Sequence, residues 1–99
     1  MNKIKIYGNE FDILSLDEID DYKNPKASIH ITNGDWDWYV IAGEVDEQND
    51  DIYCFGLVNG FVKELGFFYL REIFSIGGEL VMDFIPIGVY DIYPDFDLR

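Results

Sequence analysis

The sequence predicts an α+β fold, with an antiparallel meander sheet of about five strands and one or two short helices. Asn33-Gly34 and Asn59-Gly60 each separate two strand-like runs, and Asn-Gly is the preferred pair for a two-residue type I′ hairpin turn. Apolar residues recur at helical spacing only in short segments, which predicts the helices. A chain of 99 residues has room for one hydrophobic core, so we expect a single domain over residues 1–99.

The N-terminal part predicts a strand followed by a short helix. Residues 2–7 form a strand-like run, and residues 8–11 make a break after it. Ser15 and Glu18 have the spacing of a capping box, and apolar residues then follow at helical spacing, which predicts an amphipathic helix over residues 15–23. A proline ends this helix, because the residue before a proline is pushed out of the helical region.

The first Asn-Gly pair predicts the first hairpin. With this turn, Thr32 lies opposite Asp35, and His30 lies opposite Asp37. Side chains then alternate between two faces, as in a half-buried antiparallel sheet. The predicted core face consists of Ala27, Ile29, Ile31, Trp36, Trp38 and Val40. Because the two tryptophans share this face with aliphatic residues, we expect them in the core rather than on a ligand platform.

The second Asn-Gly pair predicts a second hairpin, in which Val58 lies opposite Phe61. An acidic loop over residues 46–51 connects the two hairpins, which together supply four strands of the meander.

The C-terminal third predicts less regular structure. Residues 69–76 predict one or two helical turns, ended by two glycines that can adopt the left-handed conformation. Residues 80–85 predict a further strand. We expect the aromatic and acidic tail, residues 90–99, to be a loop or an edge, because Pro94 argues against a central strand.

Four runs in the middle of the chain are distinctive: Trp36 to Tyr39, Cys54 to Phe61, Glu64 to Phe68, and Leu70 to Ile73. In order and spacing, these runs resemble a small bacterial family catalogued only as domain of unknown function 2958. The resemblance covers residues 27–92 and contains no catalytic motif. Proteins of this kind are carried by plasmids, integrative elements and phages, so the resemblance implies an accessory role that helps a mobile element survive in its host.

The charge of the chain excludes two classes of partner. There are 20 Asp and Glu against 7 Lys and Arg, a formal net charge of -13. Affinity for nucleic acids and for anionic membranes comes mostly from Lys and Arg, so we expect direct binding to neither. Cys54 is the only cysteine, which excludes an intramolecular disulfide, and no run of about 20 apolar residues could span a membrane. We therefore expect a cytoplasmic protein.

Ser28, His30 and Asp37 share one predicted sheet face and suggest a catalytic triad, but the expected geometry argues against it. Residues two apart on a strand stand roughly 7 Å apart, so the serine is beyond hydrogen-bond reach of the imidazole. We expect an ion pair between His30 and Asp37 instead. One His, one Cys and an acidic loop without calcium-loop spacing predict no metal site.

We therefore expect no catalytic residue, no metal, no cofactor and no enzyme activity. A hydrolase that uses a carboxylate pair remains an alternative, although the spacing identifies no acid and base for it.

Acidic residues gather in the predicted helix, in the loop between the hairpins, and near the end of the chain at Asp91, Asp95 and Asp97. Solubility is one explanation of this charge. The sharper hypothesis is nucleic-acid mimicry, in which carboxylates spaced like phosphates occupy a basic groove and electrostatic steering speeds the encounter. The predicted partner-binding residues are Asp17, Glu18, Asp20, Asp21, Asp46, Glu47, Asp50 and Asp51. With the family resemblance, this predicts a phage or plasmid protein that inhibits a host defence complex, such as a CRISPR or restriction effector.

The alternative function is a small-ligand or peptide binding module. It would use the open sheet face around His30, Asp37 and Tyr39 and would need none of the acidic clusters. The high aromatic content, 17% of residues, also exceeds what one small core readily hides. A homodimer through Phe84, Tyr90 and Tyr93 is therefore a further hypothesis.

Overall fold

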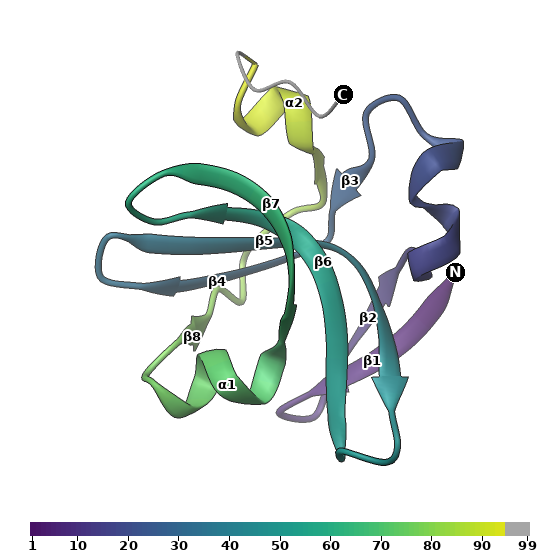
Figure 1. Ribbon diagram of the computed structural model, residues 1–99, viewed down its shortest axis with the longest axis vertical. Helices are drawn as coiled ribbons and strands as arrows, with labels where there is room; N and C mark the ends of the chain where they lie inside the picture. The colour runs from purple at the N-terminus through teal and green to yellow at the C-terminus, as the bar shows by residue number, and fades with distance from the viewer. Residues whose placement is uncertain (95–99) are drawn as a thin grey trace.

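The structure is a computed structural model, and it describes residues 1–94 (Figure 1). The elements are β1 (Asn2–Ile6), β2 (Asn9–Ile13), the 3-10 helix η1 (Leu16–Asp21), β3 (Lys26–Ala27), β4 (Ile29–Asn33), β5 (Trp36–Asp46), β6 (Asp51–Asn59), β7 (Lys63–Tyr69), α1 (Leu70–Ser75), β8 (Glu79–Leu80), β9 (Ile87–Gly88) and α2 (Val89–Ile92). The main sheet has five antiparallel strands in the order β7-β6-β5-β4-β8, so four consecutive strands form a meander. The predicted α+β fold with an antiparallel meander and short helices is confirmed.

The β4–β5 hairpin differs from the predicted register but keeps the predicted faces. Asn33 pairs with Trp36, so the central turn residues are Gly34 and Asp35 instead of Asn33 and Gly34. Gly34 has a positive φ of 59° and Asp35 does not, as in a type II′ turn, which needs glycine at its first central position. The shift moves each pairing by an even number of residues, so the alternation between core and outer face survives.

The β6–β7 hairpin differs from its prediction more strongly. Asn59 pairs with Lys63, which leaves a three-residue loop where the sequence predicts a two-residue turn. The shift is odd, so every β7 side chain lies on the face opposite to the predicted one. Phe61 at the tip of this loop is almost fully exposed and packs edge-on against Trp36, with ring centroids 5.4 Å apart.

A β-bulge interrupts the pairing of β5 with β6. Val40 pairs with Gly56 and Ala42 pairs with Phe55, so Ile41 has no partner of its own. A side chain at Gly56 would collide with the backbone carbonyl of Tyr39, which makes glycine the residue that fits beside the bulge. The bulge reverses the alternation of β5, so that even-numbered residues face the inner core before it and odd-numbered residues after it.

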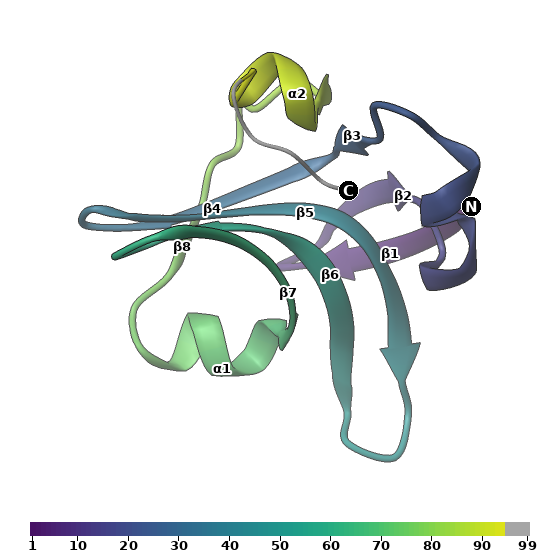
Figure 2. The ribbon, with the colours of Figure 1, turned by 45° about the horizontal axis from the view of Figure 1, so that its top comes forward.

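The bent sheet separates two hydrophobic clusters. Figure 2 shows that β5 and β6 curve strongly, with α1 on the inner side of the curve and with α2 and β3 on the opposite side. The inner cluster joins the sheet to α1 and to the β1–β2 hairpin and contains Ile4, Ile6, Ile13, Ile29, Ile31, Trp38, Val40, Cys54, Leu70 and Ile73. The outer cluster contains Leu14, Ile41, Ala42, Leu57 and Val89, with side chains of η1 and α2 packed against it.

The N-terminal hairpin and the C-terminal segment account for the other differences from prediction. The predicted break at residues 8–11 lies mostly in β2, because Tyr7 and Gly8 form a tight turn in which both φ angles are positive. Of the strand predicted over residues 80–85, only Leu80 lies in a strand, β8. α2 begins at Val89 and includes residues 90–92 of the segment predicted as a loop or an edge. Asp95 and Asp97 lie outside the described residues.

Candidate functional site

The acidic turn between β5 and β6 is held in shape by its own side chains. Asp46 accepts hydrogen bonds from the Asn49 side chain at 2.7 Å and from the Tyr69 hydroxyl at 2.8 Å. These bonds stabilise the carboxylate, and they lower the pKa of Asp46, with Asn49 as the largest cause and Tyr69 as the second. The same bond raises the pKa of Tyr69, because loss of the hydroxyl proton would remove the donor and place two negative charges together.

The other end of the turn is tied to α1 through Arg71. The guanidinium of Arg71 donates to Asp50 at 2.9 Å, and the backbone N–H of Arg71 donates to the Asp51 carboxylate at 3.0 Å. That N–H lies in the first turn of α1, where no intrahelical acceptor exists, so Asp51 acts as a remote N-terminal cap. Asp51 also accepts from the N–H of Ile52 at 2.7 Å. The turn and the helix therefore form one connected unit.

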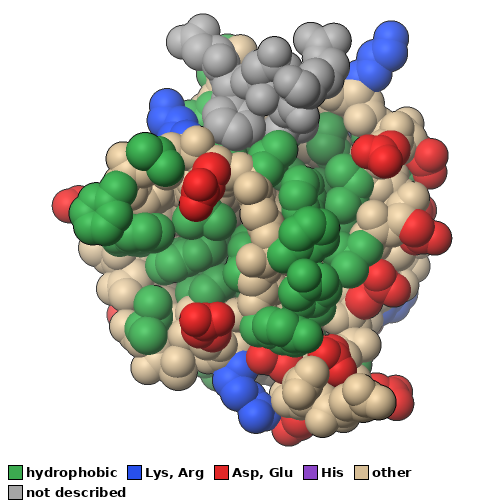
Figure 3. All heavy atoms as spheres, in the orientation of Figure 1, with side chains coloured by type: hydrophobic (Ala, Val, Ile, Leu, Met, Phe, Trp, Pro, Cys, Tyr) green, Lys and Arg blue, Asp and Glu red, His purple; other side chains and the backbone are tan. Residues whose placement is uncertain are grey.

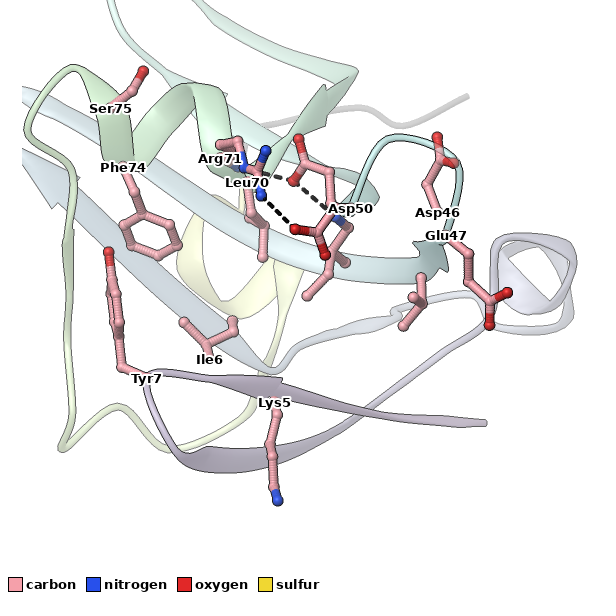
Figure 4. Close-up of a pocket in the computed structure, with 13 residues that line it drawn as sticks. Lys5, Ile6, Tyr7, Asp46, Glu47, Asp50, Leu70, Arg71, Phe74 and Ser75 are labelled. Carbon is pink, nitrogen blue, oxygen red and sulfur yellow. Dashed lines mark hydrogen bonds and ion pairs between the residues drawn. The ribbon is translucent and has the colours of Figure 1, made fainter.

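A cleft of about 810 Å³ lies between this turn, α1 and the tip of the β1–β2 hairpin (Figure 4). Its floor is apolar, with Ile6 and Leu70 pointing inward and Tyr7 against Phe74 at one end, ring centroids 5.1 Å apart. Its rim is charged. The full lining is Lys5, Ile6, Tyr7, Val45, Asp46, Glu47, Asp50, Asp51, Ile52, Leu70, Arg71, Phe74 and Ser75. All four acidic residues that the sequence predicts in the turn thus line one cleft.

The second predicted acidic cluster lies on η1. Ser15 and Glu18 form the predicted capping box, in which the Ser15 N–H donates to Glu18 at 2.9 Å. The Met1 ammonium lies 2.7 Å from the same carboxylate and, with the two Ser15 bonds, lowers the pKa of Glu18 to about 2. The Ser15 hydroxyl donates to Asp17 at 2.6 Å. The predicted helix is therefore present, as a 3-10 helix, and two of its four acids make contacts within the chain.

The acidic turn and η1 border one hollow on the outer face of the sheet. Leu16 of η1 and residues 44–48, at the end of β5 and the start of the turn, line it together with Tyr53 and Tyr69. Four aromatic side chains of β6 and β7 form a continuous row of ring contacts that begins at this hollow, with one stacked pair and two tilted pairs. We call this row the aromatic ridge: Tyr53, Phe55, Phe67 and Tyr69. Figure 3 shows a column of hydrophobic side chains down the middle of this face, with acidic side chains along its right side.

The predicted acidic residues differ in whether their carboxylates already have a partner within the chain. Within residues 1–94, the side chains of Asp20, Asp21 and Glu47 make no hydrogen bond or ion pair. The carboxylates of Asp46 and Asp51 are already hydrogen-bonded, which fixes their positions. The cluster therefore combines held and unengaged carboxylates.

The structure brings together the three residues of the predicted ligand face, His30, Asp37 and Tyr39, and other aromatic side chains pack against them. His30 Nε2 lies 2.7 Å from Asp37 Oδ1, so the expected pair forms, although the two residues are diagonal neighbours. The His30 ring stacks on Tyr39 with centroids 4.4 Å apart, and Phe84 and Tyr93 pack against this cluster. His30 is 17% exposed and Asp37 is 25% exposed. Burial, together with the neighbouring Tyr93, raises the pKa of Tyr39.

Metal ligands and the single thiol are the remaining groups that could support chemistry. Residues 1–94 contain no group of three or more His, Cys, Asp or Glu side chains that could hold a metal ion. Cys54 is buried in the inner cluster, and burial raises the pKa of its thiol to about 12. Over the same residues, no helix has the length and apolar character needed to cross a membrane.

Sequence reasoning missed the residues that organise the cleft. Arg71 and Tyr69 stand 20 or more positions from the carboxylates they contact, and no local pattern connects them. The β6–β7 pairing brings them to the turn, and an error of three residues in that register hides the relationship. One signal in the sequence could have drawn attention to β7. Its aromatic run places uncharged side chains on an edge strand, where charged residues are usual.

No protein-family model matches the chain, and neither a curated protein nor a solved structure matches it. The resemblance to domain of unknown function 2958 therefore stays a prediction.

Proposed function

We propose that this protein is a non-catalytic inhibitor that binds a basic surface of a nucleic-acid-binding complex. It would use the acidic residues of the β5–β6 turn and of η1, without cofactor or metal. The resemblance to proteins of mobile elements favours a host defence complex in the bacterial cytoplasm, a CRISPR or restriction effector, as the target. In this proposal the carboxylates occupy the groove that normally holds phosphates, and the protein itself binds no nucleic acid.

One observation carries the proposal: the four acidic residues of the turn line a single cleft that has an apolar floor. Charges of one sign around low-dielectric walls focus the electrostatic field and raise the local concentration of oppositely charged groups. The rim carries four carboxylates against Lys5 and the paired Arg71. A basic side chain of a partner can therefore meet the rim while its aliphatic stem contacts the floor.

The internal hydrogen bonds of the turn support the same proposal. Asp46, Asp50 and Asp51 are held by Asn49, Tyr69 and Arg71, so their carboxylates need little ordering when a partner arrives. Preorganised groups lose less conformational entropy on binding than mobile ones. A protein that only needed charge for solubility would gain nothing from this ordering.

The test is an inhibition assay with purified CRISPR and restriction effectors cleaving their nucleic acid, at low and high salt. The site variant neutralises the three unengaged acids, with Asp20→Asn, Asp21→Asn and Glu47→Gln. We expect its inhibition constant to rise roughly tenfold or more, mainly through slower association. Inhibition by the parent protein should also weaken as the salt concentration rises.

The matched control has the same net charge and neutralises three exposed acids away from the turn and η1, with Asp35→Asn, Glu79→Gln and Asp83→Asn. It should inhibit like the parent protein. Equal loss in both variants would show that overall charge acts without a site, and a panel of effectors with no inhibition would contradict the proposed function.

Small-ligand or peptide binding is the second candidate, and the apolar floor of the cleft favours it. A ligand seated against Ile6 and Leu70 would bind with little salt dependence, because that surface is desolvated rather than charged. The predicted ligand face at His30, Asp37 and Tyr39 remains a prediction of this candidate. Binding that survives high salt and survives the three neutralisations above would favour it over inhibition.

A further inference from the structure

The outer edge of β7 is available for pairing. In the part of the chain that the structure describes, β7 is the first strand of the sheet and pairs only with β6. Among residues 1–94, no backbone hydrogen bond from another element reaches its other side. An edge strand presents a row of unpaired N–H and C=O groups that an extended segment of another chain can join.

This edge lacks the usual protection over most of its length. Proteins discourage edge pairing with charged residues, prolines, bulges or very short strands. The opposite edge of the sheet, β8, has only two residues. β7 has seven, and after Lys63 and Glu64 the run Leu65–Tyr69 contains neither charge nor proline. The charge of Lys63 is already engaged within the chain, because its Nζ atom lies over the Tyr93 ring, 4.6 Å from the ring centroid.

The aromatic ridge supplies a side-chain surface next to the edge. Phe67 is 58% exposed and stacks on Tyr53 with ring centroids 5.4 Å apart and planes 9° apart. Its other ring neighbour is Phe55, at 5.0 Å. Stacked rings are already ordered, and their faces attract cations as well as apolar groups. A strand added to β7 would lay alternate side chains beside this ridge.

The charge around the ridge selects the kind of strand. Glu44 is exposed and pairs across from Tyr53, Asp46 is bonded to the Tyr69 hydroxyl, and Glu64 stands exposed at the start of β7. A second copy of this chain would bring another net charge of -13 to the same place, which opposes association. A basic segment would instead be attracted.

We propose that the edge of β7 takes up an extended, basic segment of a partner protein as an additional antiparallel or parallel strand. Main-chain hydrogen bonds to Leu65–Tyr69 would give the affinity, and Lys or Arg side chains on the ridge would give the selectivity. This inference rests on the proposed function for the basic character of the partner. It specifies which part of that partner is bound, an extended segment of its chain.

The probe for the test is a synthetic peptide of alternating Lys and Val, with blocked ends and the seven-residue length of β7. Amide chemical shifts of the protein are followed by NMR as the peptide is added. We expect the largest changes at residues 65–69, together with slower hydrogen exchange of amides in β7. The same peptide N-methylated at two adjacent central residues cannot pair through either of its edges, and we expect it to bind at least tenfold more weakly.

A protein variant tests the ridge. Phe67→Lys places a cation on it, and we expect roughly tenfold weaker binding of the Lys/Val peptide. Ile76→Lys is the matched control, because Ile76 is 63% exposed, carries the same change of charge and lies beyond α1. It should bind the peptide like the parent protein.

Three results would overturn the inference: equal binding of the N-methylated peptide, equal binding by the Phe67→Lys variant, or a dimer of the free protein by light scattering whose formation protects the β7 amides. Its failure can be told from failure of the proposed function. Phe67→Lys with full inhibition of an effector would overturn the inference alone, whereas peptide binding at β7 without inhibition of any effector would overturn the proposed function alone.

Discussion

Gly56 and Gly66 are directly paired across β6 and β7, yet only one of them has room for a side chain. An added Cβ at Gly56 collides with the Tyr39 carbonyl beside the bulge, whereas no atom of residues 1–94 lies within 4 Å of one at Gly66. Gly56→Ala should therefore destabilise the fold by about 2–3 kcal/mol. Gly66→Ala should stabilise it by about 0.4–1 kcal/mol, because it restricts the unfolded chain.

Urea denaturation of the two variants measures this difference. Since the substitution is the same and the positions are cross-strand neighbours, each variant is the control for the other. Equal destabilisation by both would contradict the close approach at the bulge.

The bond between Tyr69 and Asp46 predicts a change in acid titration. Tyr69→Phe removes one of the donors that lower the pKa of Asp46, so this pKa should move up towards the ordinary value of about 3.9. A carboxyl whose pKa is lower in the folded state than in the unfolded state stabilises the fold above the unfolded pKa and loses that contribution as the pH falls. The variant should therefore lose less stability between neutral and acidic pH than the parent protein.

NMR titration of the Asp46 carboxyl measures the shift directly. Tyr53→Phe is the control, because it removes a hydroxyl from the neighbouring ring, 4.8 Å from Tyr69, without removing the bond to Asp46. An unchanged Asp46 titration in Tyr69→Phe would show that the Tyr69 hydroxyl does not contribute to the low pKa of Asp46.

The burial of Cys54 predicts a thiol that reacts only on unfolding. Its pKa of about 12 keeps it protonated near neutral pH, and the inner cluster blocks access to it. Thiol labelling should be slow in the native protein and should accelerate at the denaturant concentration where the fold is lost. Rapid labelling without denaturant would contradict the burial.

The raised pKa of Cys54 also predicts how the stability of the fold changes at alkaline pH. The unfolded thiol ionises near pH 8.5 while the folded thiol stays neutral, so its contribution to stability is present below that pH and is lost as the pH rises towards 12. Cys54→Ala lacks this part of the alkaline loss, and its stability should fall less steeply than that of the parent protein above pH 8.5.

Two contacts hold the acidic turn to α1, and we expect them to differ in strength. The Asp50–Arg71 ion pair is exposed, with 94% and 62% of the side chains accessible, so Arg71→Met should cost less than about 0.5 kcal/mol. Asp51 satisfies two backbone N–H groups, one of them at the start of α1, so Asp51→Ala should cost about 1 kcal/mol. Thermal unfolding of both variants measures the ranking, and a larger loss in Arg71→Met would contradict it.

The sequence was sufficient for the elements whose signals are local. The capping box at Ser15 and Glu18 and the helical turns before Gly77 are present as predicted. Of the predicted core face of the first hairpin, Ile29, Ile31, Trp38 and Val40 lie in the inner cluster, and Trp36 packs against it partly buried. Each depends on residues within a few positions of one another, where spacing and backbone preference act directly. The acidic turn was found for the same reason.

What the sequence could not supply is the pairing register, on which the site depends. An Asn-Gly pair fits several turn geometries, and a shift of one, two or three residues decides which side chains meet across strands. The register of β7 brings Tyr69 to Asp46, and the strand then leads directly into α1 and Arg71. Long-range packing of the bent sheet sets that register, and no short stretch of sequence encodes it.

The bulge at Ile41 also bears on how other sequences should be compared with this one. Because the bulge changes which positions of β5 face inward, deleting Ile41 would exchange the inner and outer residues of half the strand. One residue more or fewer between Glu47 and Asp50 would alter the exposed acidic turn but would leave the faces of β5 and β6 unchanged. An alignment that places a gap at Ile41 therefore pairs residues that point to opposite sides of the sheet. A hydrophobic pattern that changes parity at this position would be a more reliable mark of a shared architecture than the identity of any single acidic residue.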